Sequence, residues 1–124
     1  MEGNKINYEE RAKVYADALA TFGPGMQLVV TLEELSEVAK EICKHMRGKG
    51  SHLHLAEEVA DATIMLEQVR QIFKINDEVC KVMDEKVLRL KCKIEREKAK
   101  DASRHEFLRK VFNTPAEKQE GAGK

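Results

Sequence analysis

The chain has 124 residues, and its 22 Lys and Arg balance 22 Asp and Glu, so the formal net charge is zero. This balance argues against a globally basic nucleic-acid-binding protein. Two prolines, seven glycines and 5% aromatic residues are few for a β-sandwich, and the abundance of helix-forming residues predicts an all-α fold.

The sequence shows neither a membrane-spanning segment nor a signal peptide. No apolar run approaches the roughly 20 residues that span a bilayer, and residues 1–7 are polar, unlike a signal peptide. We therefore expect a cytoplasmic protein with no membrane partner. The widely spaced Cys43, Cys80 and Cys92 form no C-x-x-C pair, and we expect free, mostly buried thiols.

Helical periodicity divides the first part of the chain into three helices. Asn7 is a predicted N-cap with an acid three residues later, so a first helix is expected over 8–21. Glycines and a proline at 23–25 then break the chain. A second helix is expected from Met26, with one apolar stripe that comprises Leu28, Leu32, Leu35, Ala39, Ile42 and Met46.

The remaining chain is also predicted to be helical. A third helix is expected over 53–73, a fourth from a cap at Asn76 to about residue 100, and a short final helix over 103–112. Residues 1–112 are therefore predicted to form one domain, and 113–124 a flexible tail. A core of this size is modest, so we expect a second subunit to bury part of the apolar surface.

Charge is distributed unevenly along the chain. Residues 1–85 carry 10 basic and 16 acidic side chains, whereas residues 86–110 carry 10 basic and 4 acidic ones. An acidic body could bind cations and a basic helix could bind anions. The alternative interpretation is the ordinary charge decoration of solvated helices.

Two helices each carry a pair of acids at i, i+3 spacing. These pairs are Glu34 with Glu37, and Glu58 with Asp61, and each pair projects from one side of its helix. If the helices pack antiparallel, the four carboxylates can surround one point, where their repulsion requires a cation. Oxygen donors of this kind select Mg²⁺, with Mn²⁺ as a substitute.

The alternative is that these acids form a solvated face. The third helix argues against it, because Ile64 and Met65 follow Asp61 one turn later and Asp is a weak helix former in the middle of a helix. We therefore favour the metal site. The Glu-x-x-His pairs of di-iron carboxylate bundles are absent from the sequence.

Basic residues near these acids are candidate anion ligands. Lys86 lies in the apolar seam of the fourth helix, where it either snorkels to water or points a cation at phosphate oxygens, with Arg89 in support. The segment between the acid pairs is also basic and could close over phosphates; it contains Lys44, His45, Arg47, Lys49, His52 and His54. His52-x-His54 alone is weak evidence for a metal ligand.

The acidic signature resembles that of a known family. Glu34-x-x-Glu37 followed by Glu58-x-x-Asp61 is similar to the E-x-x-E…E-x-x-D motif of MazG-type nucleotide pyrophosphohydrolases. Segments 32–37, 56–62 and 82–90 resemble the corresponding family helices, including a recurrent lysine and arginine. The resemblance covers roughly residues 8–95.

The resemblance implies an all-α fold whose antiparallel helices form a four-helix-bundle core completed by dimerisation, as a dimer or a dimer of dimers. It implies Mg²⁺-dependent hydrolysis of a nucleoside triphosphate between the α and β phosphates, as in nucleotide-pool house-cleaning. The implied metal ligands are Glu34, Glu37, Glu58 and Asp61. Lys86 would contact phosphate, and Gln27 would lie near the base or sugar.

The chemistry of phosphoanhydride hydrolysis assigns further roles. Glu34, Glu37 and Lys86 are the candidate catalytic residues, with either Glu37 or Glu33 accepting the proton of the attacking water. The candidate substrate-binding residues are Lys86, Arg89, Lys44, Arg47, Lys49 and Gln27.

Two other functions remain open at this point. A non-catalytic, dimeric helical interaction protein would keep the bundle without metal-dependent stability. A nucleic-acid-binding bundle would use residues 86–110 and bind in a salt-sensitive manner. The complete set of four acids argues against the first, and the acidic body argues against the second, so no nucleic-acid partner is expected.

Overall fold

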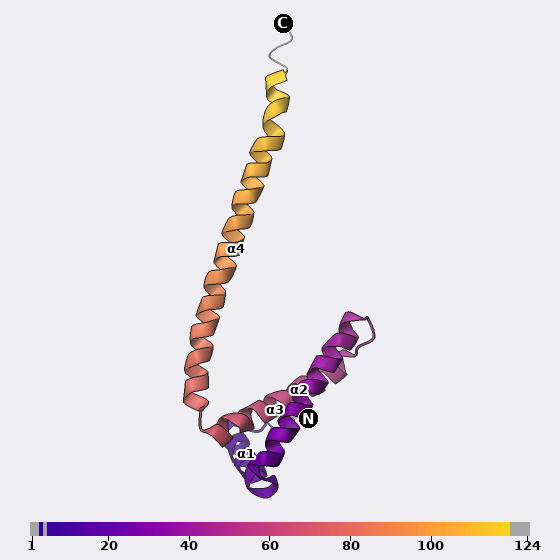
Figure 1. The fold of residues 1–124 in the computed structure, drawn as a ribbon, viewed down its shortest axis with the longest axis vertical. Helices are drawn as coiled ribbons and strands as arrows, with labels where there is room; N and C mark the ends of the chain where they lie inside the picture. Colours follow the sequence, from indigo (N-terminus) through magenta and orange to yellow (C-terminus); the bar gives the residue numbers. More distant parts are fainter. Residues whose placement is uncertain (1–2, 4, 120–124) are drawn as a thin grey trace. The chain divides into compact units, whose positions relative to one another are not determined.

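The protein is described by a computed structural model, which covers residue 3 and residues 5–119. Within that part the chain contains no strand and forms four helices (Figure 1). They are α1 (Tyr8–Phe22), α2 (Pro24–Met46), α3 (His52–Phe73) and α4 (Asn76–Gln119). The predicted all-α class is confirmed.

The chain divides into two compact units. The first comprises residues 1–79 and contains α1, α2, α3 and the start of α4, and the second comprises residues 80–124. The candidate acids all belong to the first unit. The four-helix bundle and its completion by dimerisation remain predictions.

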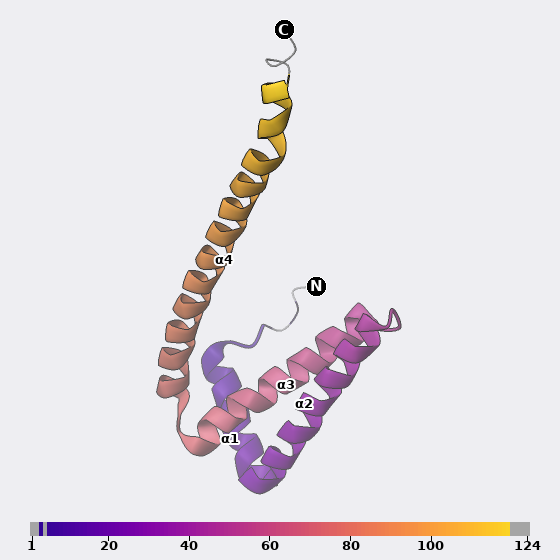
Figure 2. The same ribbon diagram turned by 45° about the horizontal axis from the view of Figure 1, so that its top comes forward.

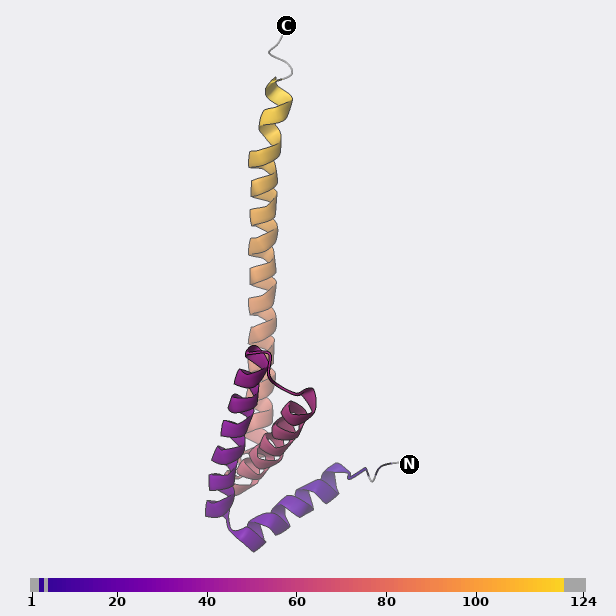
Figure 3. The same cartoon turned by 90° about the vertical axis from the view of Figure 1, so that its right-hand side faces the viewer.

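Local sequence signals set the beginning of α1 and its separation from α2. The Asn7 side chain accepts from the Glu10 backbone amide at 2.9 Å, and the Glu10 carboxylate accepts from the Asn7 amide at 3.0 Å. This reciprocal pair is the expected capping box. Gly23 adopts a φ of 85°, which favours glycine, and Pro24 then begins α2. Figure 3 shows the sharp turn between the two helices.

Helices α2 and α3 form an antiparallel pair (Figure 2). Residues 47–51 join them, with Gly48 at a φ of 72°. The Ser51 side chain caps α3 by accepting from the His54 amide at 3.4 Å. This short connection brings the acid-bearing halves of the two helices alongside each other.

The α2–α3 contact is largely polar on the α2 side. Gln27, Thr31 and Glu41 are the buried residues of α2, and α3 contributes buried Ala62, Met65 and Gln68. The Gln27 amide nitrogen donates to the Gln68 amide oxygen at 2.8 Å in this buried layer. A buried amide group is unfavourable without a hydrogen-bond partner. This hydrogen bond therefore fixes the alignment of α2 along α3.

The apolar stripe of α2 does not face the core of this unit. Leu32 is 69% exposed and Met46 is 83% exposed, and Leu35 and Ile42 are also exposed. The periodicity correctly groups these residues on one face. The packing inside the chain uses the opposite, polar face, so the stripe is left as an accessible apolar surface.

Helix α1 contacts both α2 and α3. Its Tyr15 is the buried aromatic residue of this unit, with 7% of its surface exposed. The Gln71 amide of α3 donates to the Ala12 carbonyl at 3.1 Å. These contacts position α1 beside the C-terminal half of α3.

Helix α4 is continuous over 44 residues, which corresponds to about 66 Å. The predicted interruption near residues 100–103 is therefore wrong, because that segment contains neither Gly nor Pro to end a helix. The helix also extends through residues 113–119 of the expected tail, and residues 120–124 lie outside the described residues.

The cysteines form no disulfide, but the expectation that they are mostly buried is wrong. Cys43, Cys80 and Cys92 are all exposed. In the described part of the chain, no helix has both the length and the apolar character to cross a membrane.

The Gln27–Gln68 hydrogen bond provides a test of the α2–α3 packing. We predict that Gln27→Leu lowers the free energy of unfolding by about 1–3 kcal/mol, because it leaves the buried Gln68 amide without its partner. The double variant with Gln68→Leu should recover much of this loss, because neither buried amide is then unsatisfied. Urea unfolding at a fixed protein concentration measures both effects, and a double variant less stable than either single one would contradict the packing.

Candidate functional site

Three of the four predicted metal ligands converge on the α2–α3 pair. Glu34 comes from α2, and Glu58 and Asp61 come from adjacent turns of α3. One carboxylate oxygen from each lies within 4.8 Å of the other two. We call Glu34, Glu58 and Asp61 the acidic trio. Glu34 and Glu58 are half-buried and Asp61 is exposed, so the cluster is open to solvent on one side.

The electrostatics of Glu34 reflect this crowding. Partial burial raises the pKa of Glu34 above its ordinary value, and the negative charges of Asp61 and Glu58 raise it further. Glu33 and Glu37 on the same helix contribute in the same direction. The trio thus gathers negative charge at a point where repulsion opposes ionisation.

Glu37 is not part of this cluster. Its carboxylate lies 3.6 Å from the Lys40 ammonium in a largely exposed ion pair. Exposed pairs of this kind contribute little free energy. Glu37 lies one turn from Glu34 on α2.

The candidate anion ligands near the end of α2 differ in their surroundings. The Lys44 ammonium donates to the buried Glu41 carboxylate at 2.6 Å. This bond lowers the pKa of Glu41 and raises the pKa of Lys44. Lys44 is thus neutralised by Glu41, whereas Arg47 and Lys49 are exposed around the connection to α3.

Gln27, a candidate contact for a base or sugar, is buried and bonded to Gln68. Its observed role is in the packing of α2 on α3. Lys86 and Arg89 are both exposed on α4 and belong to the second compact unit.

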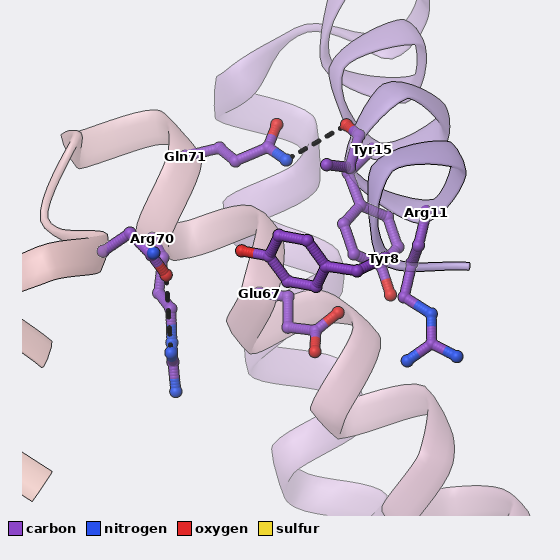
Figure 4. A pocket seen from close by; sticks show the side chains of 8 residues that line it. Tyr8, Arg11, Tyr15, Glu67, Arg70 and Gln71 are labelled. Atoms are coloured by element: carbon purple, nitrogen blue, oxygen red, sulfur yellow. Dashed lines mark hydrogen bonds between the residues drawn. The ribbon is translucent and has the colours of Figure 1, made fainter. Parts of the chain in front are cut away.

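A cavity between α1 and α3 was not predicted from the sequence. Its volume is about 200 Å³, and its lining includes Tyr8, Arg11, Tyr15, Glu67, Arg70 and Gln71. Figure 4 shows Arg11, Tyr15 and Glu67 gathered in this region. Burial raises the pKa of Tyr15 to about 12, the hydrogen bond and charge of Glu67 add to this, and Arg11 opposes it.

An adjoining, mainly apolar cavity has a volume of about 520 Å³ and also reaches Tyr15 and Glu67. Sequence reasoning missed Arg11, Glu67 and Gln71 because each is an ordinary surface residue in a helical pattern. The available signal was the placement of two tyrosines, Tyr8 and Tyr15, two turns apart on α1.

Comparison with known proteins supplies no independent assignment: no family model matches the sequence, and neither a curated protein nor a solved structure is detectably similar.

Repulsion within the acidic trio generates a prediction for the metal-free protein. The pKa of Glu34 is higher in the folded chain than in the unfolded chain. As pH rises above the ordinary glutamate range, the unfolded chain ionises first, so this group contributes a loss of stability with rising pH. We predict that Glu34→Gln increases the free energy of unfolding near neutral pH without divalent cations.

Chemical unfolding at several pH values measures this effect. Glu33→Gln is the matched control, because Glu33 neighbours Glu34 but lies outside the trio. This variant should gain less stability than Glu34→Gln. A Glu34→Gln variant that is less stable than wild type near neutral pH would show that the trio is not a site of net repulsion.

Proposed function

We propose that the protein is a divalent-cation-dependent nucleoside triphosphate pyrophosphohydrolase resembling the MazG type. The observation that carries the proposal is the convergence of Glu34 with Glu58 and Asp61 from an adjacent antiparallel helix. The same residues form three of the four positions of the sequence signature. Position in the fold and sequence pattern thus support the same ligand set.

The donor chemistry of the acidic trio fits Mg²⁺. Carboxylate oxygens are the protein ligands that Mg²⁺ prefers, and the ion usually completes its shell with water and substrate phosphates. The exposed side at Asp61 leaves room for such ligands. A bound divalent cation would offset the repulsion on Glu34, neutralise phosphate charge and acidify water.

Glu37 is proposed as the fourth acid of this site. Its weak, exposed contact with Lys40 can be exchanged at little cost. In this proposal Glu34, Glu58 and Asp61 hold the cation, and a glutamate of α2, either Glu37 or Glu33, accepts a proton from water. Carboxylates placed in this way serve both as ligands and as general bases.

Basic side chains are proposed to bind the phosphates. Arg47 and Lys49 are exposed on the connection between the acid-bearing helices, where their positive charges are available to a triphosphate. Lys44 would contribute only after exchange from Glu41. Lys86 and Arg89 of α4 are proposed from the resemblance to complete the phosphate contacts.

A second copy of the chain is proposed as the partner that covers the apolar stripe. Large apolar side chains are exposed along α2, including Leu32 at 69% and Met46 at 83%. Apolar surface of this kind marks an association surface. A homo-oligomer, either a dimer or a dimer of dimers, would bury this surface and extend the helical core.

The activity is tested directly with purified protein and each natural NTP and dNTP, with and without Mg²⁺. We predict Mg²⁺-dependent release of the monophosphate and pyrophosphate for at least one nucleotide. Asp61→Asn should reduce the rate at least about 100-fold, because loss of a direct ligand exceeds the 10- to 100-fold loss typical of outer-shell changes.

Asp17→Asn is the matched control, because Asp17 is an exposed acid of α1 outside the trio, and it should retain the wild-type rate. Absence of release with every nucleotide, together with no effect of Mg²⁺ on thermal stability, would contradict the proposal. That result would favour the non-catalytic helical interaction protein.

A further inference from the structure

A second group of potential ligands lies where α2 ends and α3 begins. His45 in the last turn of α2 faces His52 at the start of α3, with ring centres 5.2 Å apart and planes tilted by 32°. We call His45 and His52 the histidine pair. None of the proposed catalytic roles uses this pair.

His45, at the end of α2, has a buried ring nitrogen. Its Nε2 atom is shielded from solvent and, within the described part of the chain, has no hydrogen-bond partner. A buried polar nitrogen without a partner is unfavourable, and it indicates a ligand or a role beyond packing.

Gly50 encloses this imidazole. A Cβ atom at position 50 would lie 2.2 Å from His45 Cδ2, which no side chain can tolerate without movement of the ring. The close approach of the connection to His45 therefore requires glycine at position 50. The same glycine-containing connection, with Gly48 at positive φ, is the element that would shift to admit an ion.

The separation of the two rings fits a shared metal ion. A histidine nitrogen binds zinc at about 2.0–2.1 Å, which puts each ring centre roughly 3.2 Å from the metal. Two such ligands at a tetrahedral angle have ring centres about 5 Å apart. The observed 5.2 Å between His45 and His52 matches this value.

We propose that His45 and His52 bind a transition-metal divalent cation of the Zn²⁺ class, with water completing its coordination. Imidazole nitrogen favours Zn²⁺ over Mg²⁺, whereas the carboxylates of the acidic trio favour Mg²⁺. The ion ties the end of α2 to the start of α3 and so stabilises the antiparallel pair that carries the acidic trio.

The test is a titration of tag-free, full-length protein with Zn²⁺ by calorimetry and with Co²⁺ by visible absorption. With Mg²⁺ in excess to occupy the acidic trio, we expect one Zn²⁺ site per chain and the intense Co²⁺ bands of a tetrahedral site. His52→Gln should weaken Zn²⁺ binding at least tenfold and abolish those bands. Because His52 is exposed, this variant should keep its helical circular dichroism spectrum.

A matched variant identifies the site. His105→Gln removes an exposed histidine of α4 and should leave Zn²⁺ binding unchanged. Zn²⁺ binding that survives His52→Gln, or that is lost in His105→Gln, would overturn the proposal, as would the absence of Zn²⁺ binding to wild type. Because the readout is Zn²⁺ affinity, the result is independent of nucleotide hydrolysis.

Discussion

The structure of the first unit depends on one packing choice, in which α2 contacts α3 through its polar face. Buried Gln27 bonds to Gln68 across this contact, and Glu41 is buried further along the same helix. Glu34 lies between them on α2, which is why its carboxylate meets those of Glu58 and Asp61. The acidic trio is therefore a direct consequence of how the two helices face each other.

This arrangement carries a cost that a bound cation would relieve. Half-buried carboxylates close together resist ionisation, as the raised pKa of Glu34 indicates. Proteins retain such local conflicts mainly where function uses them. The same packing leaves the leucine-bearing face of α2 exposed, so the proposed metal site and the proposed association surface have one structural origin.

Much of the fold follows from sequence patterns, because caps and helix breakers act locally. Asn7 with Glu10 marks the start of α1, and Gly23 with Pro24 separates α1 from α2. The convergence of three signature acids was also predictable, because i, i+3 spacing fixes a helix face and a short connection favours an antiparallel partner. The continuous α4 was missed although no Gly or Pro interrupts residues 95–112.

Other features could not be predicted because they depend on long-range choices. Periodicity shows that Leu32 and Leu35 share a face, but not whether that face packs within the chain or against another chain. The hydrogen bond between Gln27 and Gln68 joins residues 41 positions apart, and no local sequence pattern predicts it. The proximity of His45 to Gly50 likewise arises only when the connection has folded.

The central claim is that the acidic trio binds a divalent cation, and anomalous X-ray diffraction from crystals grown with Mn²⁺ tests it most directly. We predict a Mn²⁺ peak in direct contact with carboxylate oxygens of Glu34, Glu58 and Asp61, with Glu37 turned toward it from Lys40. Crystals in which these three carboxylates lie apart, or remain together in saturating Mn²⁺ without an anomalous peak, would contradict the account.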